Sequence, residues 1–120
     1  MEIPKDVMLQ VLKLKITVIF KLFNGKYELC GERNITSGKK SYAVAEILST
    51  NVIKLDDLSK EDIQNGGFPS KDLFLRWWIS HGHTEHNPIY VVRFNILRLK
   101  PLGKWYLRAM NEHIPHIKSE

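Results

Sequence analysis

A cluster of three histidines and one glutamate occupies residues 81–86, with the sequence HGHTEH. Imidazole nitrogens and carboxylate oxygens bind divalent transition metals, so His81, His83 and His86 form a weak candidate metal site. A complete site needs further ligands, and the two remaining histidines lie near the carboxyl end of the chain. We therefore expect this string to form a solvated loop, and we expect the protein to use no metal or other cofactor.

Basic side chains that could contact phosphate groups are concentrated at the two ends of the sequence. Residues 1–40 hold eight basic and four acidic residues, and residues 97–120 hold five basic and two acidic residues. Residues 41–96 between them hold five basic and seven acidic residues, so the net charge of the chain is +5. If the ends meet in space, they form one basic face suited to a polyanion such as RNA. The alternative is that the lysines serve solubility. The candidate RNA- or phosphate-binding residues are Lys13, Lys15, Thr17, Lys21, Lys39, Lys40, Arg76 and Arg93.

Other reactive or stacking side chains have a structural interpretation beside the functional one. Trp77 and Trp78 follow Arg76, and a tryptophan in a cleft can stack on a base, but we expect both rings to pack in the core. Cys30 has no activating base near it in the sequence, so we expect a small buried hydrophobic side chain rather than a nucleophile. Glu46 could act as a general base if partly buried, and we expect it to face solvent.

Length and composition indicate one globular domain. The chain has 120 residues, of which 43% are hydrophobic, enough for an ordinary core. Its single cysteine cannot form an internal disulfide, and together with the lack of a signal-peptide pattern this favours a cytoplasmic protein. The longest apolar-leaning run, residues 12–23, contains three lysines, which argues against a membrane span.

The hydrophobic patterning predicts helices and strands in a mixed order. Residues 4–12 and 70–80 have the apolar spacing of amphipathic helices, and Ser59 predicts a cap for a short helix over 60–64. Strict alternation over 14–21 predicts a strand, and Asn24-Gly25 predicts a hairpin turn into a second strand over 26–30. We expect a loop over 31–40, strands over 41–49, 51–55 and 89–97, and a short helix over 104–111. This order indicates an α+β domain with a mainly antiparallel, barrel-like sheet.

Several local strings resemble those of the ASCH domain, a branch of the PUA-like superfamily. They are Ala45-Glu46-Ile47-Leu48, the strand and acidic turn over 52–59, Glu61-Asp62, Gly66-Gly67-Phe68, and the strand over 89–94. The resemblance implies an antiparallel β-barrel with flanking helices over residues 1–97, and RNA or nucleotide binding between barrel and helices. Residues 98–120 are then a carboxyl-terminal extension, with its short helix packed on the same domain.

The amino-terminal half departs from the family pattern. ASCH domains carry a signature G-x-K-x-x-E/T-x-R, and in the matching segment Leu14, Ile16 and Ile19 replace its first three conserved positions, whereas Lys21 keeps the positive charge of the last. Family members that hydrolyse acetylcytidine use that lysine, the threonine and a glutamate after the acidic turn, and residues 64–67 contain no carboxylate. The string over 37–41, SGKKS, is similar to the signature, but we interpret it as a loop. We therefore expect no catalytic residues.

The sequence leaves two alternatives to an RNA-binding module. One is an ASCH-type hydrolase, either an acetylcytidine amidohydrolase or a ribonuclease, with a shifted active site. The other is a protein-interaction module in which Trp77, Trp78 or Trp105 forms an exposed patch. A polar cleft near residues 15–21 would favour the hydrolase, whereas a slot filled by Ile16 and Ile19 would favour binding without catalysis.

Overall fold

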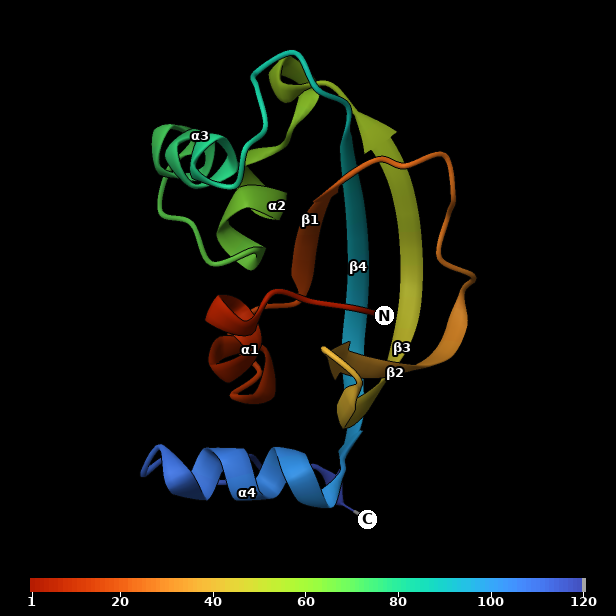
Figure 1. Ribbon diagram of the computed structural model, residues 1–120, viewed down its shortest axis with the longest axis vertical. Coiled ribbons are helices and arrows are strands. Elements are labelled where there is room, and N and C mark those ends of the chain that lie inside the picture. The colour runs from red at the N-terminus through yellow and green to blue at the C-terminus, as the bar shows by residue number, and fades with distance from the viewer. Residues whose placement is uncertain (120) are drawn as a thin grey trace.

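An open antiparallel sheet in the order β1-β4-β3-β2 runs through the computed structural model, which describes residues 1–119 (Figure 1). Its strands are β1 (Val18–Leu22), β2 (Gly31–Ser37), β3 (Lys40–Ile53) and β4 (Ile89–Leu99), and the short β5 (Lys118–Ser119) pairs in parallel with β4. The α+β class is confirmed. The expected closure into a barrel is not, because no pairing between β1 and β2 exists within the described residues.

The outer edge of β2 is covered by the amino-terminal segment instead of by another long strand. The Ile3 N–H donates to the Thr36 carbonyl at 2.9 Å, and the Thr36 N–H donates to the Met1 carbonyl at 2.9 Å. Glu2 and Thr36 form an isolated parallel bridge. These bonds satisfy backbone groups of the β2 edge, so the sheet does not need to close on itself.

In Figure 1, α1, α2 and α3 are drawn to the left of the strands, and α4 crosses below them. Their bounds are α1 (Lys5–Leu12), the 3₁₀ turn η1 (Leu55–Asp57), α2 (Lys60–Asn65), α3 (Lys71–Ser80) and α4 (Pro101–Ala109). Ser59 and Ser70 cap α2 and α3 by accepting hydrogen bonds from the backbone N–H three residues on. The predicted helices are confirmed, although α4 begins at Pro101, three residues before the predicted start. Within residues 1–119 no helix has the length and apolar character needed to cross a bilayer.

Two hydrophobic cores pack on opposite faces of β1 and β4. Side chains alternate across a strand, so Val18, Phe20 and Val91 enter one core with α2 and α3. Ile19 and Val92 point the other way and enter a core with α1, α4 and the remaining strands. The central strand β4 is therefore buried on both faces over its first half.

The course of the chain between β1 and β3 differs from the prediction. Asn24-Gly25 does form a turn, with Gly25 at φ +88°, but β1 pairs with β4, and residues 26–30 form no strand. The tight hairpin lies at Gly38, with φ +64°, so β2 occupies the predicted loop. The two strands predicted over 41–55 are one continuous strand, β3, whose register with β4 shifts twice.

Candidate nucleic-acid interface

The segment that we aligned with the ASCH signature in the sequence, residues 14–21, is filled by apolar side chains. Ile16 and Ile19 are buried, and with Phe20, Phe68 and Trp77 they line a cavity of about 10 Å³, together with Pro4, Val7 and Gly66. A volume of this size holds one water molecule at most. The slot therefore offers neither the space nor the polar groups that binding and activating a substrate require.

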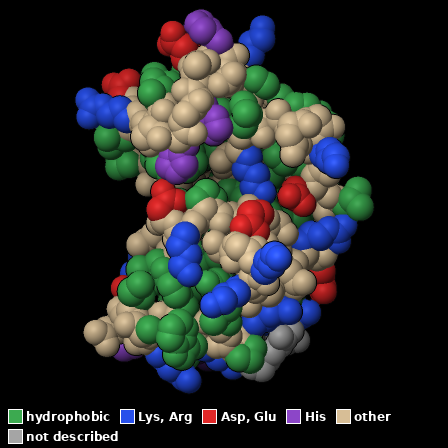
Figure 2. Space-filling view, in the orientation of Figure 1, with side chains coloured by type: hydrophobic (Ala, Val, Ile, Leu, Met, Phe, Trp, Pro, Cys, Tyr) green, Lys and Arg blue, Asp and Glu red, His purple; other side chains and the backbone are tan. Residues whose placement is uncertain are grey.

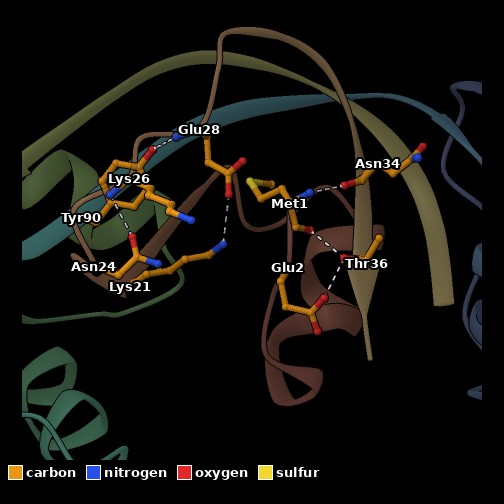
Figure 3. Close-up of polar contacts among 9 residues, drawn as sticks. All are labelled: Met1, Glu2, Lys21, Asn24, Lys26, Glu28, Asn34, Thr36 and Tyr90. Atoms are coloured by element: carbon orange, nitrogen blue, oxygen red, sulfur yellow. Dashed lines mark hydrogen bonds and ion pairs between the residues drawn. The ribbon is translucent and has the colours of Figure 1, made fainter. Parts of the chain in front are cut away.

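A larger hollow of about 450 Å³ lies beside the signature segment and is called here the amino-terminal hollow. Glu2, Ile3, Pro4, Lys5, Lys21 and Ser37 line it. Lys21 sits near the end of β1, opposite Tyr90 of β4, and points to the same face of the strand as Ile19. Its amine lies 3.6 Å from a Glu28 carboxylate oxygen (Figure 3).

Burial affects the pKa of the Lys21 amine. Removal from water lowers the pKa of Lys21 below its usual 10.5, and the Glu28 carboxylate opposes that shift. A strand position that holds a lysine in a half-buried setting carries a cost in folding free energy. An anion in the hollow would compensate part of that cost by supplying a second negative charge.

The hairpin turn between β2 and β3 is fixed beside this hollow by Glu2. One Glu2 carboxylate oxygen accepts from the Gly38 N–H at 2.7 Å, and the other accepts from the Thr36 hydroxyl at 2.7 Å. Ser37, at the start of the turn, lines the hollow, and the exposed Lys39 and Lys40 follow directly. The predicted Lys21 and the predicted Lys39-Lys40 pair are thus brought to one part of the surface.

A second hollow, of about 300 Å³, shares Lys21 with the first and is called here the tyrosine hollow. It is lined by Lys21, Leu22, Asn24, Lys26, Tyr27, Glu28 and Tyr90. The Glu28 N–H donates to the Tyr90 hydroxyl, and the Lys26 N–H donates to the Asn24 side-chain oxygen at 3.0 Å (Figure 3). These bonds fix the backbone of a segment that has no regular secondary structure.

The two hollows and the adjoining turn carry a surplus of positive charge. Their lysines are Lys5, Lys21, Lys26, Lys39 and Lys40, against the carboxylates of Glu2 and Glu28. Lysine and arginine side chains gather across the middle of this face of the molecule (Figure 2). A net charge of this sign over two adjacent hollows is suited to phosphate groups.

The other predicted phosphate-binding residues lie outside these hollows. Lys13 pairs with Glu112 at 3.2 Å, Lys15 is exposed after α1, and Arg76 is exposed on α3. Thr17 is half-buried between α2 and β4, where its backbone N–H donates to Asn65 and its carbonyl accepts from Phe94. Their contact with RNA stays a prediction.

Arg93 is held by protein groups. Its guanidinium donates from Nε and Nη2 to the two carboxylate oxygens of Asp62, and from Nη1 to the side-chain oxygens of Ser49 and Asn51 at 3.3 and 2.8 Å. Asp62 belongs to α2, whereas Ser49 and Asn51 belong to β3. The arrangement binds α2 to β3 and β4, and its role in RNA binding stays a prediction.

The two basic ends of the sequence meet on another part of the sheet. A hollow of about 280 Å³ is lined by Glu32, Arg33, Asn34, Val44, Arg98 and Lys100. Arg33 comes from the amino-terminal basic part of the sequence, and Arg98 and Lys100 come from the carboxyl-terminal part. Arg98 lies 3.7 Å from a Glu32 carboxylate oxygen, which reduces the charge available to a ligand there.

The three histidines of the 81–86 string have different neighbours. His81 lies 3.6 Å from Asp6 and packs on the Trp77 ring, His83 packs on Trp78, and His86 lies 3.6 Å from Glu85. Over residues 1–119 no group of three or more metal-binding side chains converges on one point. The string forms the turn between α3 and β4, as expected.

The remaining candidates are placed as follows. Cys30 is exposed, so the prediction that it is buried is wrong; the chain at 23–30 runs over the surface instead of pairing as a strand. Glu46 faces outward on β3. Trp78 is in the core and Trp77 is half-buried against it, whereas Trp105 is exposed on α4.

Four residues of this surface were not singled out in the sequence: Lys5, Lys26, Tyr27 and Glu28. Lys26, Tyr27 and Glu28 were assigned to a paired strand, and that assignment gave no reason to single them out. The signal that could have found them is the Asn24-Gly25 turn, which returns the chain to the Lys21 end of β1. Lys5 lies on α1, and only the tertiary fold brings it to the hollow.

Comparisons with known proteins give a match in structure alone. No family model matches the sequence, and no curated protein matches it. A protein of the DUF984 family from Enterococcus faecalis V583 superimposes with a TM-score of 0.60 and 10% identity, over 77% of this chain and 70% of that one. An ASCH domain from Lactobacillus crispatus JV V101 superimposes with a TM-score of 0.52 and 14% identity, over 76% of this chain and 70% of that one. An ASCH protein from Zymomonas mobilis superimposes with a TM-score of 0.58 and 13% identity, over 98% of this chain and 82% of that one.

Proposed function

We propose that this chain, which has the fold of an ASCH domain, is a PUA-like module that binds RNA or a nucleotide and lacks the catalytic residues of the family's hydrolases. The observation that carries the proposal is the surplus of lysines around the two hollows that share Lys21. The similarity of fold agrees with a PUA-like binding module but does not by itself identify a ligand.

The chemistry of the site favours binding over catalysis. In the sequence alignment Lys21 corresponds to the arginine of the signature, and the turn with the exposed Lys39 and Lys40 extends the positive surface. Ile16 and Ile19 fill the positions where the family's amidohydrolases place a lysine and a threonine. The two carboxylates at this surface already have protein partners, because Glu2 accepts from the Thr36 hydroxyl and the Gly38 N–H and Glu28 pairs with Lys21. This arrangement favours holding a nucleic acid over cleaving it.

The test is an anisotropy titration of the protein with labelled RNA at about 50 mM and about 200 mM salt. We expect an affinity that falls as salt rises, because bound lysines release counterions from the phosphates. Changing Lys39 and Lys40 together to alanine should weaken binding and lower the slope of log affinity against log salt by about 1.4, if both lysines contact a single strand.

A matched control removes the same charge elsewhere. Lys54 and Lys60 are exposed near η1 and α2 and line neither of the two hollows. Changing both to alanine should reduce affinity much less than the Lys39-Lys40 change. Absence of RNA binding at low salt, or an equal loss in both variants, would contradict the proposed function.

A further inference from the structure

The segment between β1 and β2 presents an exposed aromatic ring beside two lysines. The Asn24-Gly25 turn brings Tyr27 back against Phe23, with ring centroids 5.0 Å apart. Tyr27 remains 56% exposed, although Phe23 is half-buried and Tyr90 is buried beneath it. An exposed aromatic ring next to charged groups has a free face on which a ligand base can stack.

Tyr27 is held in place on its protein side. Its ring lies 5.7 Å from that of Tyr90 at an interplanar angle of 78°, an edge-on contact that leaves part of the ring free. The next residue, Glu28, is anchored by its backbone bond to the Tyr90 hydroxyl. A ring fixed before binding loses little conformational entropy when a ligand stacks on it.

The charges around the ring suit a phosphate group. Lys21 and Lys26 line the same hollow of about 300 Å³, and their side chains both extend toward Glu28 (Figure 3). The Glu28 carboxylate neutralises one of the two amines. Lys21 also lines the amino-terminal hollow, so a polyanion at Lys21 can continue toward Lys39 and Lys40.

We propose that the tyrosine hollow binds one unpaired nucleotide of single-stranded RNA, with its base stacked on Tyr27 and its phosphate beside Lys21 and Lys26. This inference rests on the proposed function and specifies the form of RNA that the module selects. In a duplex, neighbouring base pairs cover both faces of each internal base, whereas an unpaired base can offer a face to an aromatic side chain. The module should therefore prefer single-stranded segments or loops to continuous duplex.

The experiment compares a single-stranded RNA with a duplex of the same length by anisotropy, for wild type and three Tyr27 variants. Tyr27→Ala should weaken binding to the single strand by about tenfold or more and change duplex binding little. Tyr27→Phe should keep most of the affinity because it keeps the ring. Tyr27→Leu should not restore it, because leucine has apolar area but no aromatic face.

Leu29→Ala is the matched control, since Leu29 is 70% exposed in the same segment and does not line the hollow. Thermal unfolding of each variant shows whether it remains folded. The inference is overturned by wild-type affinity in Tyr27→Ala, by full affinity in Tyr27→Leu, or by equal losses on single strand and duplex. A change in self-association of Tyr27→Ala, with RNA affinity unchanged, would also overturn it and assign the ring to a protein contact.

The two proposals can fail separately. If the Lys39-Lys40 variant loses affinity and Tyr27→Ala does not, the module binds RNA but does not stack a base on Tyr27. If wild type binds neither RNA at low salt, the proposed function itself is contradicted, and the inference is overturned with it.

Discussion

The carboxylate of Asp62 on α2 and the guanidinium of Arg93 on β4 are joined by two parallel hydrogen bonds, a fork geometry that fixes both groups. Asp62 is 7% exposed, and its own backbone N–H is capped by Ser59. Ser49 and Asn51 accept from the same guanidinium, so one side chain connects three elements of the fold. Removal of either charged partner leaves the other without its counter-charge in a poorly solvated position.

We expect Asp62→Asn and Arg93→Ala each to lower the free energy of unfolding by about 1–2 kcal/mol. The reason is the loss of charge-assisted hydrogen bonds and the desolvation of the group left behind. Urea denaturation monitored by tryptophan fluorescence measures the change. Arg76→Ala, at an exposed position of α3, serves as the control and should stay within about 0.5 kcal/mol of wild type.

Lys21 should make stability depend on alkaline pH. Its pKa is lowered in the folded protein by burial, so the unfolded chain, with a pKa of 10.5, holds the proton more tightly. The resulting destabilisation is complete below the folded-state pKa and disappears as pH rises through that value toward 10.5. The unfolding free energy of wild type should therefore rise by less than about 1 kcal/mol as pH increases toward 10.5. Lys21→Met lacks the titrating group and should not show this rise.

Urea midpoints measured from about pH 8 to about pH 10.5 test the effect of Lys21. Lys26→Met is the control, because Lys26 lines the same hollow but is exposed. The difference in urea midpoint between wild type and Lys21→Met should change with pH. The difference in urea midpoint between wild type and Lys26→Met should change less. A constant difference for Lys21→Met across this range would contradict the assigned cause of the shift.

Ile16→Lys introduces the lysine that the ASCH signature has at the position aligned with Ile16, but it should not introduce the chemistry of that lysine. The side chain would enter an apolar slot with space for one water molecule, so we expect a loss of about 3 kcal/mol or more in unfolding free energy. Ile16→Ala, which leaves a void, should cost about 2–4 kcal/mol. Lys15→Ala next to it is the exposed control.

The same Ile16 variants test the hydrolase alternative. Neither wild type nor Ile16→Lys should release acetate from N4-acetylcytidine, because Ile19 is also apolar and buried and residues 64–67 provide no carboxylate. Turnover by wild type that survives in Ile16→Ala would mean that a catalytic site lies elsewhere in the chain.

Gly103→Ala should destabilise the protein, although alanine normally favours a helix. A Cβ at Gly103 would lie 2.2 Å from the backbone carbonyl oxygen of Tyr42, which belongs to β3 and cannot move independently. We expect a loss of about 2 kcal/mol or more, against the gain of about 1 kcal/mol that helix propensity alone predicts. Arg108→Ala on the exposed side of α4 is the comparison, and thermal unfolding is the measurement.

The sequence predicts the helices of this fold better than its sheet. Caps such as Ser59 and Ser70 and the spacing of apolar side chains act within a few residues, so α2 and α3 were predicted nearly to their bounds. Strand pairing joins distant residues, and the local signal at Asn24-Gly25 was a true turn between segments that do not pair. The hairpin at Gly38 and the covering of β2 by residues 1–3 depend on tertiary contacts.

The candidate site was predicted only in part, because residue types are visible in the sequence and tertiary contacts are not. Lys21, Lys39 and Lys40 stood out because charge is visible in the sequence. Lys21 lines both hollows, and Lys39 and Lys40 follow Ser37, which lines one of them. Tyr27 was hidden within a segment assigned to a strand, and its exposure follows from the surface course of residues 23–30. Arg93 was identified as basic, but its partner Asp62 lies 31 residues away in the chain and pairs with it only in the folded state.

The central position of β4 has a consequence for how the protein opens. β4 is paired with β1 and β3 and is buried on both faces over its first half, so the amide protons of that half should be among the last to exchange with solvent. β1 is a five-residue edge strand, and the segment after it has no ladder partner within the described residues. We therefore expect local opening of residues 21–30 to require less free energy than global unfolding. Hydrogen exchange over 18–30 should slow when a ligand occupies the tyrosine hollow, while exchange in β4 stays the same.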